Sequence, residues 1–214
     1  MSDMILILDH SQEFGMEIAR RLRAEQIHAR IAHADTPVEE IRSLAPCGIV
    51  LCGEAGGELD REILALGIPV LAVGCAAYRL LACMGGANAG VAISEKKAQV
   101  SYARSALFTG VSDGERFFHE AQTLMLPADI AETASAGGCT IAFEDAENRH
   151  YGIQFDLERN DLEGAQILTN FVLDICGCSR TWTLETALEQ AQQMLVMGRL
   201  EVLGLVTLTL QVTN

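Results

Sequence analysis

Short apolar runs separated by helix-like segments constrain the fold of this chain most. Met4–Leu8, Gly48–Cys52 and Ile68–Val73 are too short for helices and lack polar alternation. Such runs are typical of parallel strands that are buried on both faces. Ser11–Ala24 places apolar residues at helical spacing between the first two strands. The alternation of strands and helices predicts an α/β fold with an open, mostly parallel sheet and helices on both faces.

The second half of the chain has a less regular pattern. Val91–Tyr102 and Arg116–Leu126 are predicted to be antiparallel strands. Thr140–Phe143 and Tyr151–Phe155 are predicted to form a hairpin. Apolar residues at helical spacing predict a helix over Leu162–Ile175. Beyond it we expect a short C-terminal extension that contains a helix, Thr183–Met197, and a strand, Val202–Val212.

Charge and cysteine content exclude several classes of protein. The 214 residues carry a formal net charge of −14, so we expect no binding to nucleic acid or to an anionic membrane surface. The first residues, MSDMILILD, lack the basic region of a secretory signal, and no stretch is long enough to cross a membrane. An odd count of seven cysteines then predicts a cytoplasmic protein with free thiols rather than disulfides.

One turn in the first half has the pattern of a nucleophile elbow. The apolar strand Ile68–Val73 runs through a tight turn into a helix that ends at Gly85-Gly86. At such an elbow one side chain projects above the sheet beside backbone N–H groups that can hold an oxyanion. Ligands of open α/β sheets bind outside the carboxyl ends of the strands, so Asp9, the loop after Cys52 and the turn after Val73 are the candidate region.

Residues 4 to 183 are collinear with a known family. The chain resembles the class I glutamine amidotransferase domain, in particular that of GMP synthase. The resemblance implies a flavodoxin-like fold over residues 1–178, an extension over 179–214, and a link to purine biosynthesis. The matching segments are Ile5–Asp9, Ile18–Arg21, Val38–Arg42, Gly48–Leu51, Gly67–Leu71, Tyr151–Phe155, Asn170–Cys178 and Thr181–Thr183.

The same resemblance indicates that the catalytic triad is degenerate. The family uses a Cys, His, Glu triad to hydrolyse glutamine. Here the cysteine position falls on Gly74, and Cys75 lies one residue later. The histidine position is Asp156, and Glu158 alone retains the family residue.

The positions that bind substrate in the family are also changed. The oxyanion loop of the family becomes Cys52–Ala55, which includes Gly53 and Glu54. A glutamine-binding position of the family falls on Tyr78, and of a Ser-His-Gly-Asp loop only His119 remains. The residues that we consider candidates for lining a ligand pocket are Gly53, Glu54, Cys75, Tyr78, His119 and Asp156.

Cys75 is a poor replacement for the lost nucleophile on two physical grounds. A shift of one residue at a tight turn points the side chain elsewhere, and nucleophilic attack tolerates little misplacement. A thiol also needs a nearby base or cation to ionise, whereas a carboxylate at Asp156 is expected to raise its pKa. Gly74 by itself fits a strained turn, because glycine adopts such backbone conformations freely.

The sequence therefore predicts a catalytically inactive, amidotransferase-like pseudoenzyme that acts as a binding, regulatory or scaffold subunit. One alternative is an active amidotransferase subunit that uses Cys75 in a rearranged site and delivers ammonia to a synthetase. Another is a hydrolase that uses Asp156, Glu158 or Glu54 as acid and base. The expected partners are a synthetase of the ATP-pyrophosphatase type or a second copy of the chain.

The sequence predicts no bound cofactor or metal. Cys176 and Cys178 have the spacing of a metal-binding pair, but no second pair of Cys or His residues follows at suitable spacing. No P-loop with Lys and Ser or Thr occurs in the chain, so we do not expect it to adenylate a nucleotide by itself.

Overall fold

The computed structural model describes residues 3–10, 13–53, 59–92, 97–118, 121–157, 161–183, 185, 186 and 188. The chain divides into two compact units, Met1–Ser179 and Arg180–Asn214. The fold given below is that of the first unit. Most of the predicted helix Thr183–Met197 and all of the predicted strand Val202–Val212 lie outside the described residues.

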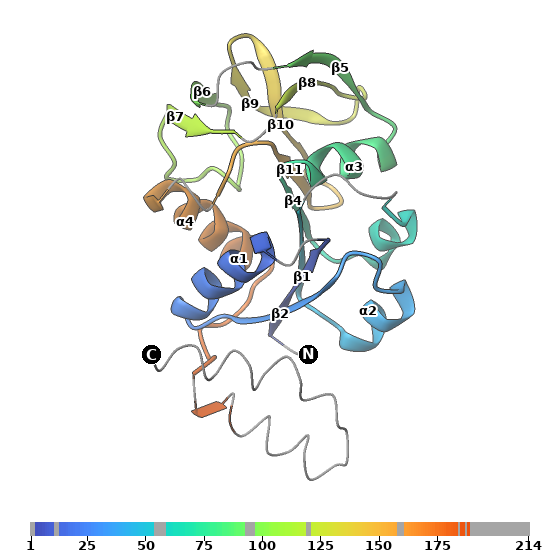
Figure 1. The fold of residues 1–214 in the computed structure, drawn as a ribbon, viewed down its shortest axis with the longest axis vertical. Coiled ribbons are helices and arrows are strands. Elements are labelled where there is room, and N and C mark those ends of the chain that lie inside the picture. Colours follow the sequence, from blue (N-terminus) through green and yellow to red (C-terminus); the bar gives the residue numbers. More distant parts are fainter. Residues whose placement is uncertain are drawn as a thin grey trace. The chain divides into compact units, whose positions relative to one another are not determined.

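Nine strands of the described residues form one mixed sheet in the order β2-β1-β3-β4-β11-β10-β9-β6-β7 (Figure 1). Its parallel part consists of β2 (His28–His33), β1 (Met4–Asp9), β3 (Gly48–Cys52), β4 (Val70–Val73) and β11 (His150–Ile153). Its antiparallel part consists of β10 (Cys139–Asp145), β9 (Ala131–Ala136), β6 (Lys97–Tyr102) and β7 (Gly114–Phe117). A second sheet pairs β5 (Ala87–Ala92) with β8 (Gln122–Met125).

Helices cover both faces of the parallel part of the sheet (Figure 1). One face packs against α1 (Glu13–Ala24), α4 (Asp161–Thr169) and the π-helical η2 (Asn170–Ile175). The other face packs against α2 (Val38–Leu44), the 3₁₀ helix η1 (Arg61–Leu66) and α3 (Ala76–Cys83).

Strand β1 shows why its sequence is apolar throughout. Successive side chains of a strand point to opposite faces. Ile5 and Ile7 belong to the core beneath α1 and α4, whereas Leu6 and Leu8 belong to the core beneath α2 and α3. All four side chains are at most 1% exposed. This confirms the predicted open, flavodoxin-like α/β sheet with helices on both faces.

The strand predictions for residues 91 to 126 are wrong in their extent. Each predicted long strand is two shorter strands that belong to different sheets: β5 and β8 pair with each other, while β6 and β7 pair at the edge of the main sheet. The hairpin of β10 and β11 is confirmed, with Asp145 opposite His150. Strand β9 was not predicted, because its sequence AETASA carries small and polar side chains without an apolar alternation.

The expectation of seven free thiols is wrong for one pair of cysteines. A disulfide joins Cys47 to Cys178 across 131 residues of sequence. It ties the residue before β3 to the end of the first unit. The signal was missed because cysteine count alone does not reveal which residues meet in space. No helix among the described residues is long and apolar enough to span a membrane.

Candidate functional site

The turn between β4 and α3 keeps the backbone of a nucleophile elbow without the side chain. Gly74 has a left-handed φ of +63°, and a Cβ atom built on it would meet nothing within 4 Å. The Gly74 amide donates a hydrogen bond to the carbonyl of Ile153 at 2.8 Å, and its carbonyl accepts one from Ala77 at 3.1 Å. The position therefore has both the strained backbone and the open space that an elbow nucleophile requires.

Cys75 does not share this conformation. It is the residue before α3, with φ −64° and ψ −24°, which are ordinary helical values. Its side chain therefore starts from a right-handed helical backbone and not from the elbow. This agrees with the prediction that a shift of one residue changes the direction of the thiol.

A cation lies near Cys75, which the sequence analysis did not foresee. Arg79 lies four residues later on α3, and its charge interacts with the thiols of Cys52, Cys75 and Cys83 and with Asp35. Burial lowers the pKa of Arg79, and the interactions with these thiols act in the opposite direction. Residues i and i+4 of a helix are neighbours on its surface, so the sequence spacing carried this signal.

Asp156 lies near the same edge of the sheet as Gly74. Strands β4 and β11 are parallel neighbours in which Val73 pairs with Ile153, so the residues that follow them leave the sheet together. Asp156 is only 5% exposed, and its amide donates to the carbonyl of Phe117 at 2.9 Å. The structure thus brings the carboxylate of Asp156 to the region beyond the elbow.

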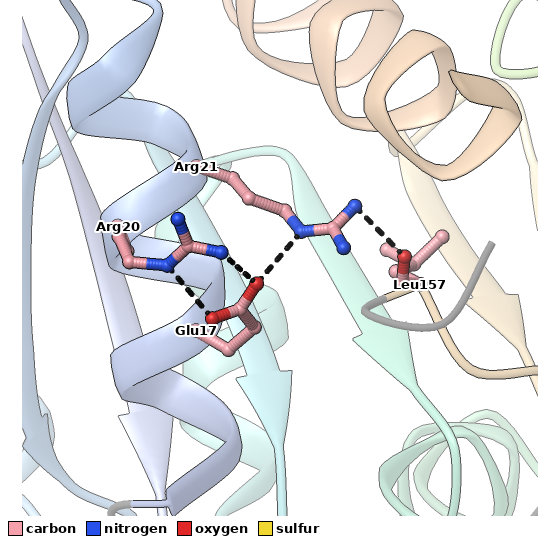
Figure 2. Close-up of polar contacts among 4 residues, drawn as sticks. All are labelled: Glu17, Arg20, Arg21 and Leu157. Carbon is pink, nitrogen blue, oxygen red and sulfur yellow. Dashed lines mark hydrogen bonds and ion pairs between the residues drawn. The ribbon is translucent and has the colours of Figure 1, made fainter. Parts of the chain in front are cut away.

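Helix α1 contacts the backbone of Leu157, the residue after Asp156 in the sequence, and Figure 2 shows this contact. Nη1 of Arg21 donates to the carbonyl of Leu157 at 3.2 Å, and its Nε donates to Glu17 at 3.1 Å. Arg20 also donates to Glu17, at 2.6 Å. The hydrogen bond from Arg20 is the largest cause of the lowered pKa of Glu17. The ionised Glu17 therefore positions Arg21 for its contact with Leu157.

Tyr78 is tied to the strand side of the site. Its hydroxyl donates to Oε1 of Gln154 at 2.5 Å, and Gln154 is fully buried. The side-chain Nε2 of Gln154 donates to the backbone carbonyl of Gln122 at 2.7 Å. The backbone amide of Gln122 donates to Oε1 of Gln154 at 2.8 Å. A phenol thus takes part in a buried hydrogen-bond network beside the turn between β4 and α3.

Gly53, another predicted pocket residue, is in tight contact with Asp9. It has a φ of +91°, and a Cβ atom at this position would overlap Oδ1 of Asp9. The second carboxylate oxygen of Asp9 accepts a 2.7 Å hydrogen bond from the amide of Gly15. Gly53 is therefore required by close packing at the end of β3. Glu54, His119 and Glu158 lie outside the described residues, and their predicted roles stay predictions.

Three further side chains gather at this edge that the sequence analysis did not select. His10, His33 and Asp35 form the one group of three or more His, Cys, Asp or Glu residues with metal-ligand spacing in the part of the chain that the structure describes. Nη1 of Arg79 lies 2.5 Å from Nε2 of His10. His10 and His33 are 23 positions apart in sequence, and only the pairing of β1 with β2 brings them together.

Known GMP synthases are similar to this chain in sequence. The chain is 35% identical over 205 residues to a GMP synthase [glutamine-hydrolyzing] of Neisseria meningitidis serogroup B. It is 32% identical over 201 residues to that of Caldanaerobacter subterraneus. Each match covers 88% of this chain and 39% of the relative. The chain resembles a class I glutamine amidotransferase domain of the GMP synthase kind.

Solved structures show the same amidotransferase-like fold. A putative GMP synthase subunit from Thermoplasma acidophilum superposes with a TM-score of 0.66 at 22% identity, covering 81% of this chain and 94% of that one. A glutamine amidotransferase of Thermotoga maritima gives 0.59 at 16% identity, covering 92% and 94%. No family model matches the chain. The amidotransferase-like chain spans about two fifths of the length of the GMP synthases it matches.

Proposed function

We propose that this chain is an amidotransferase-like protein that does not hydrolyse glutamine and acts as a binding, regulatory or scaffold subunit. The observation that carries the proposal is Gly74, which has the elbow backbone at φ +63° and no side chain to attack a substrate. Covalent catalysis at an elbow needs a thiolate or alkoxide at that position. The fold has retained the strained turn, and the nucleophile is missing from it.

The surroundings of Gly74 support the same proposal. Asp156 stands at the family's histidine position, and an ionised carboxylate disfavours ionisation of a nearby thiol. Tyr78 stands at a glutamine-binding position, where its hydroxyl is committed to Gln154. A substrate amide would have to break that hydrogen bond before it could occupy the position.

The partner that we propose is a synthetase of the ATP-pyrophosphatase type, with self-association as the alternative. We propose that the protein acts in the cytoplasm. The relatives named GMP synthase support this proposal, since they extend well beyond the length that this chain matches. Purification of the tagged chain from its own cells, followed by mass spectrometry, tests it. Recovery of a synthetase in fixed proportion supports the proposal, and recovery of neither a synthetase nor a second copy contradicts it.

The central experiment is a glutaminase assay on the purified chain, alone and with the recovered partner. We expect no release of ammonia above that of a heat-denatured sample, and the same result for Cys75→Ala and for Cys83→Ala, a matched cysteine of α3. A known glutaminase in the same buffer shows that the assay works. Ammonia release that is lost in Cys75→Ala and kept in Cys83→Ala would overturn the proposal.

A second function can be tested because Arg79 interacts with the thiol of Cys75. A guanidinium favours the thiolate, which is an observation in favour of a rearranged amidotransferase that uses Cys75. Arg79 interacts with Cys83 as well, so the two thiols share this charge in the comparison below. An electrophilic glutamine analogue distinguishes the two functions by peptide mapping. Labelling of Cys75 that free glutamine blocks supports the active enzyme. Labelling of Cys75 and Cys83 at the same slow rate supports the inactive one.

A further inference from the structure

Two histidines and an aspartate meet at the carboxyl ends of β1 and β2. His10 follows directly after β1, His33 is the last residue of β2, and Asp35 lies two residues beyond. Their potential ligand atoms all lie within 4.8 Å of one another. The strands are parallel neighbours with Asp9 paired to His33, so hydrogen-bonded backbone fixes where the two imidazoles start.

One pair of donors already has the separation of two ligands on a single ion. Nδ1 of His33 lies 3.3 Å from Oδ2 of Asp35. Tetrahedral zinc with metal–ligand distances of about 2.0–2.2 Å places neighbouring ligand atoms about 3.3–3.5 Å apart. The His10 ring lies edge-on to that of His33, with 5.6 Å between the ring centroids, so His10 needs only a side-chain adjustment to join them.

The donors are accessible from solvent, and Nδ1 of His33 also accepts a 3.3 Å hydrogen bond from the amide of Asp35, which an ion would displace. The side chains of His33 and Asp35 are 51% and 71% exposed, and His10 is partly buried. An ion can therefore reach the group from solvent without opening the core. Positions on the ion that the protein leaves free remain available to water or to a small ligand.

The side chain of Arg79 contacts one of the three potential ligands, His10. A guanidinium can only donate hydrogen bonds, and its Nη1 lies 2.5 Å from Nε2 of His10. Nε2 of His10 is therefore the acceptor in this contact. Arg79 is also attracted by the charge of Asp35. A positive group thus already occupies the place where the lone pair and the carboxylate attract a cation.

We propose that His10, His33 and Asp35 form a binding site for a divalent cation of the zinc class, which competes with Arg79 for Nε2 of His10. Imidazole nitrogen selects zinc, cobalt, nickel or copper over magnesium or calcium. Three protein ligands of the His, His, carboxylate type are a set that leaves a further coordination position open. The proposal does not depend on whether the chain hydrolyses glutamine.

Titration of the tag-free full chain with Co²⁺, followed by displacement with Zn²⁺, tests the site. We expect one Co²⁺ per chain with visible absorption bands and without the near-ultraviolet bands of cobalt thiolates. His33→Gln and Asp35→Asn should each weaken binding of Co²⁺ by at least about 10-fold. At metal sites, even the loss of a residue that only hydrogen-bonds to a ligand weakens affinity by about 10-fold or more. Both side chains are largely exposed, and thermal melting confirms that the variants fold.

His28→Gln is the matched control, because His28 begins the same strand that His33 ends. It should bind Co²⁺ as the parent chain does. In NMR spectra, Zn²⁺ should move the ring signals of His10 and His33 and leave that of His28 in place. Three results would each overturn the proposal: no binding, binding unchanged in His33→Gln, or thiolate bands that disappear in Cys75→Ser.

Discussion

The hydroxyl of Tyr78 on α3 donates a 2.5 Å hydrogen bond to Oε1 of Gln154, which follows β11. This bond joins the helix after the elbow to the segment that leads to Asp156. Gln154 is fully buried and also exchanges two hydrogen bonds with the backbone of Gln122. The network links the second sheet, through β8, to the candidate site.

Tyr78→Phe should lower the free energy of unfolding by about 1 kcal/mol, the usual net value of one hydrogen bond. Oε1 of Gln154 keeps its bond from Gln122, so the loss stays moderate. Urea denaturation measures it. Tyr151→Phe is the control, because its hydroxyl makes no hydrogen bond among the described residues and its ring packs on Phe171. Equal effects in the two variants would contradict the role of the Tyr78 bond.

Gly74→Ala should fold and lose about 1–3 kcal/mol of unfolding free energy. The cost comes from the φ of +63°, a backbone conformation that residues with a Cβ atom rarely adopt. It does not come from a clash, because a Cβ atom there meets no neighbour. Gly152→Ala tests the opposite situation, in which the Cβ atom would overlap the ring of Phe143. Overpacking should cost Gly152→Ala about 1–3 kcal/mol and shift the Phe143 ring. A Gly74→Ala chain as stable as the parent would show that the turn is not held in the left-handed region.

Stability should fall as the pH decreases below about 6.5, partly because of His150. Burial lowers the pKa of His150 below its ordinary value of 6.5. Between 6.5 and the lower folded value, the unfolded chain binds a proton that the folded chain does not, so the free energy of unfolding decreases as the pH falls. His28 has a pKa lowered in the same direction, with burial as the main cause. The urea midpoint of unfolding should change less between pH values above and below 6.5 in His150→Gln than in the parent chain. It should change less still in the variant that also carries His28→Gln. An undiminished dependence in the double variant would contradict this origin.

The Cys47–Cys178 disulfide should leave five of the seven cysteines open to alkylation in denaturant without reductant. Mass spectrometry counts the modified residues. Reduction should lower the free energy of unfolding by about 4–5 kcal/mol, since the closed loop spans 131 residues and loop entropy grows with its length. In Cys47→Ser, reduction should no longer change stability. Modification of all seven cysteines in the parent chain would contradict the disulfide.

The parallel half of the sheet was predictable because burial on both faces demands uninterrupted apolar sequence. The runs Met4–Leu8 and Gly48–Cys52 carry that signal in their composition alone. The strand β9 does not, since Ala, Ser and Thr side chains suit several conformations. It is a strand because β10 and β6 both offer it backbone hydrogen bonds.

By itself, the sequence predicted a tight turn after β4, because a turn depends on the local order of residues. The resemblance to the amidotransferase family then implied that Gly74 occupies the elbow. The resemblance likewise implied the positions of Asp156 and Tyr78. Only the tertiary structure decided that Tyr78 bonds to Gln154, that Cys47 meets Cys178, and that His10, His33 and Asp35 converge. The physical reason is that strand pairing and helix packing set distances between residues that are remote in sequence, and no local pattern encodes those distances.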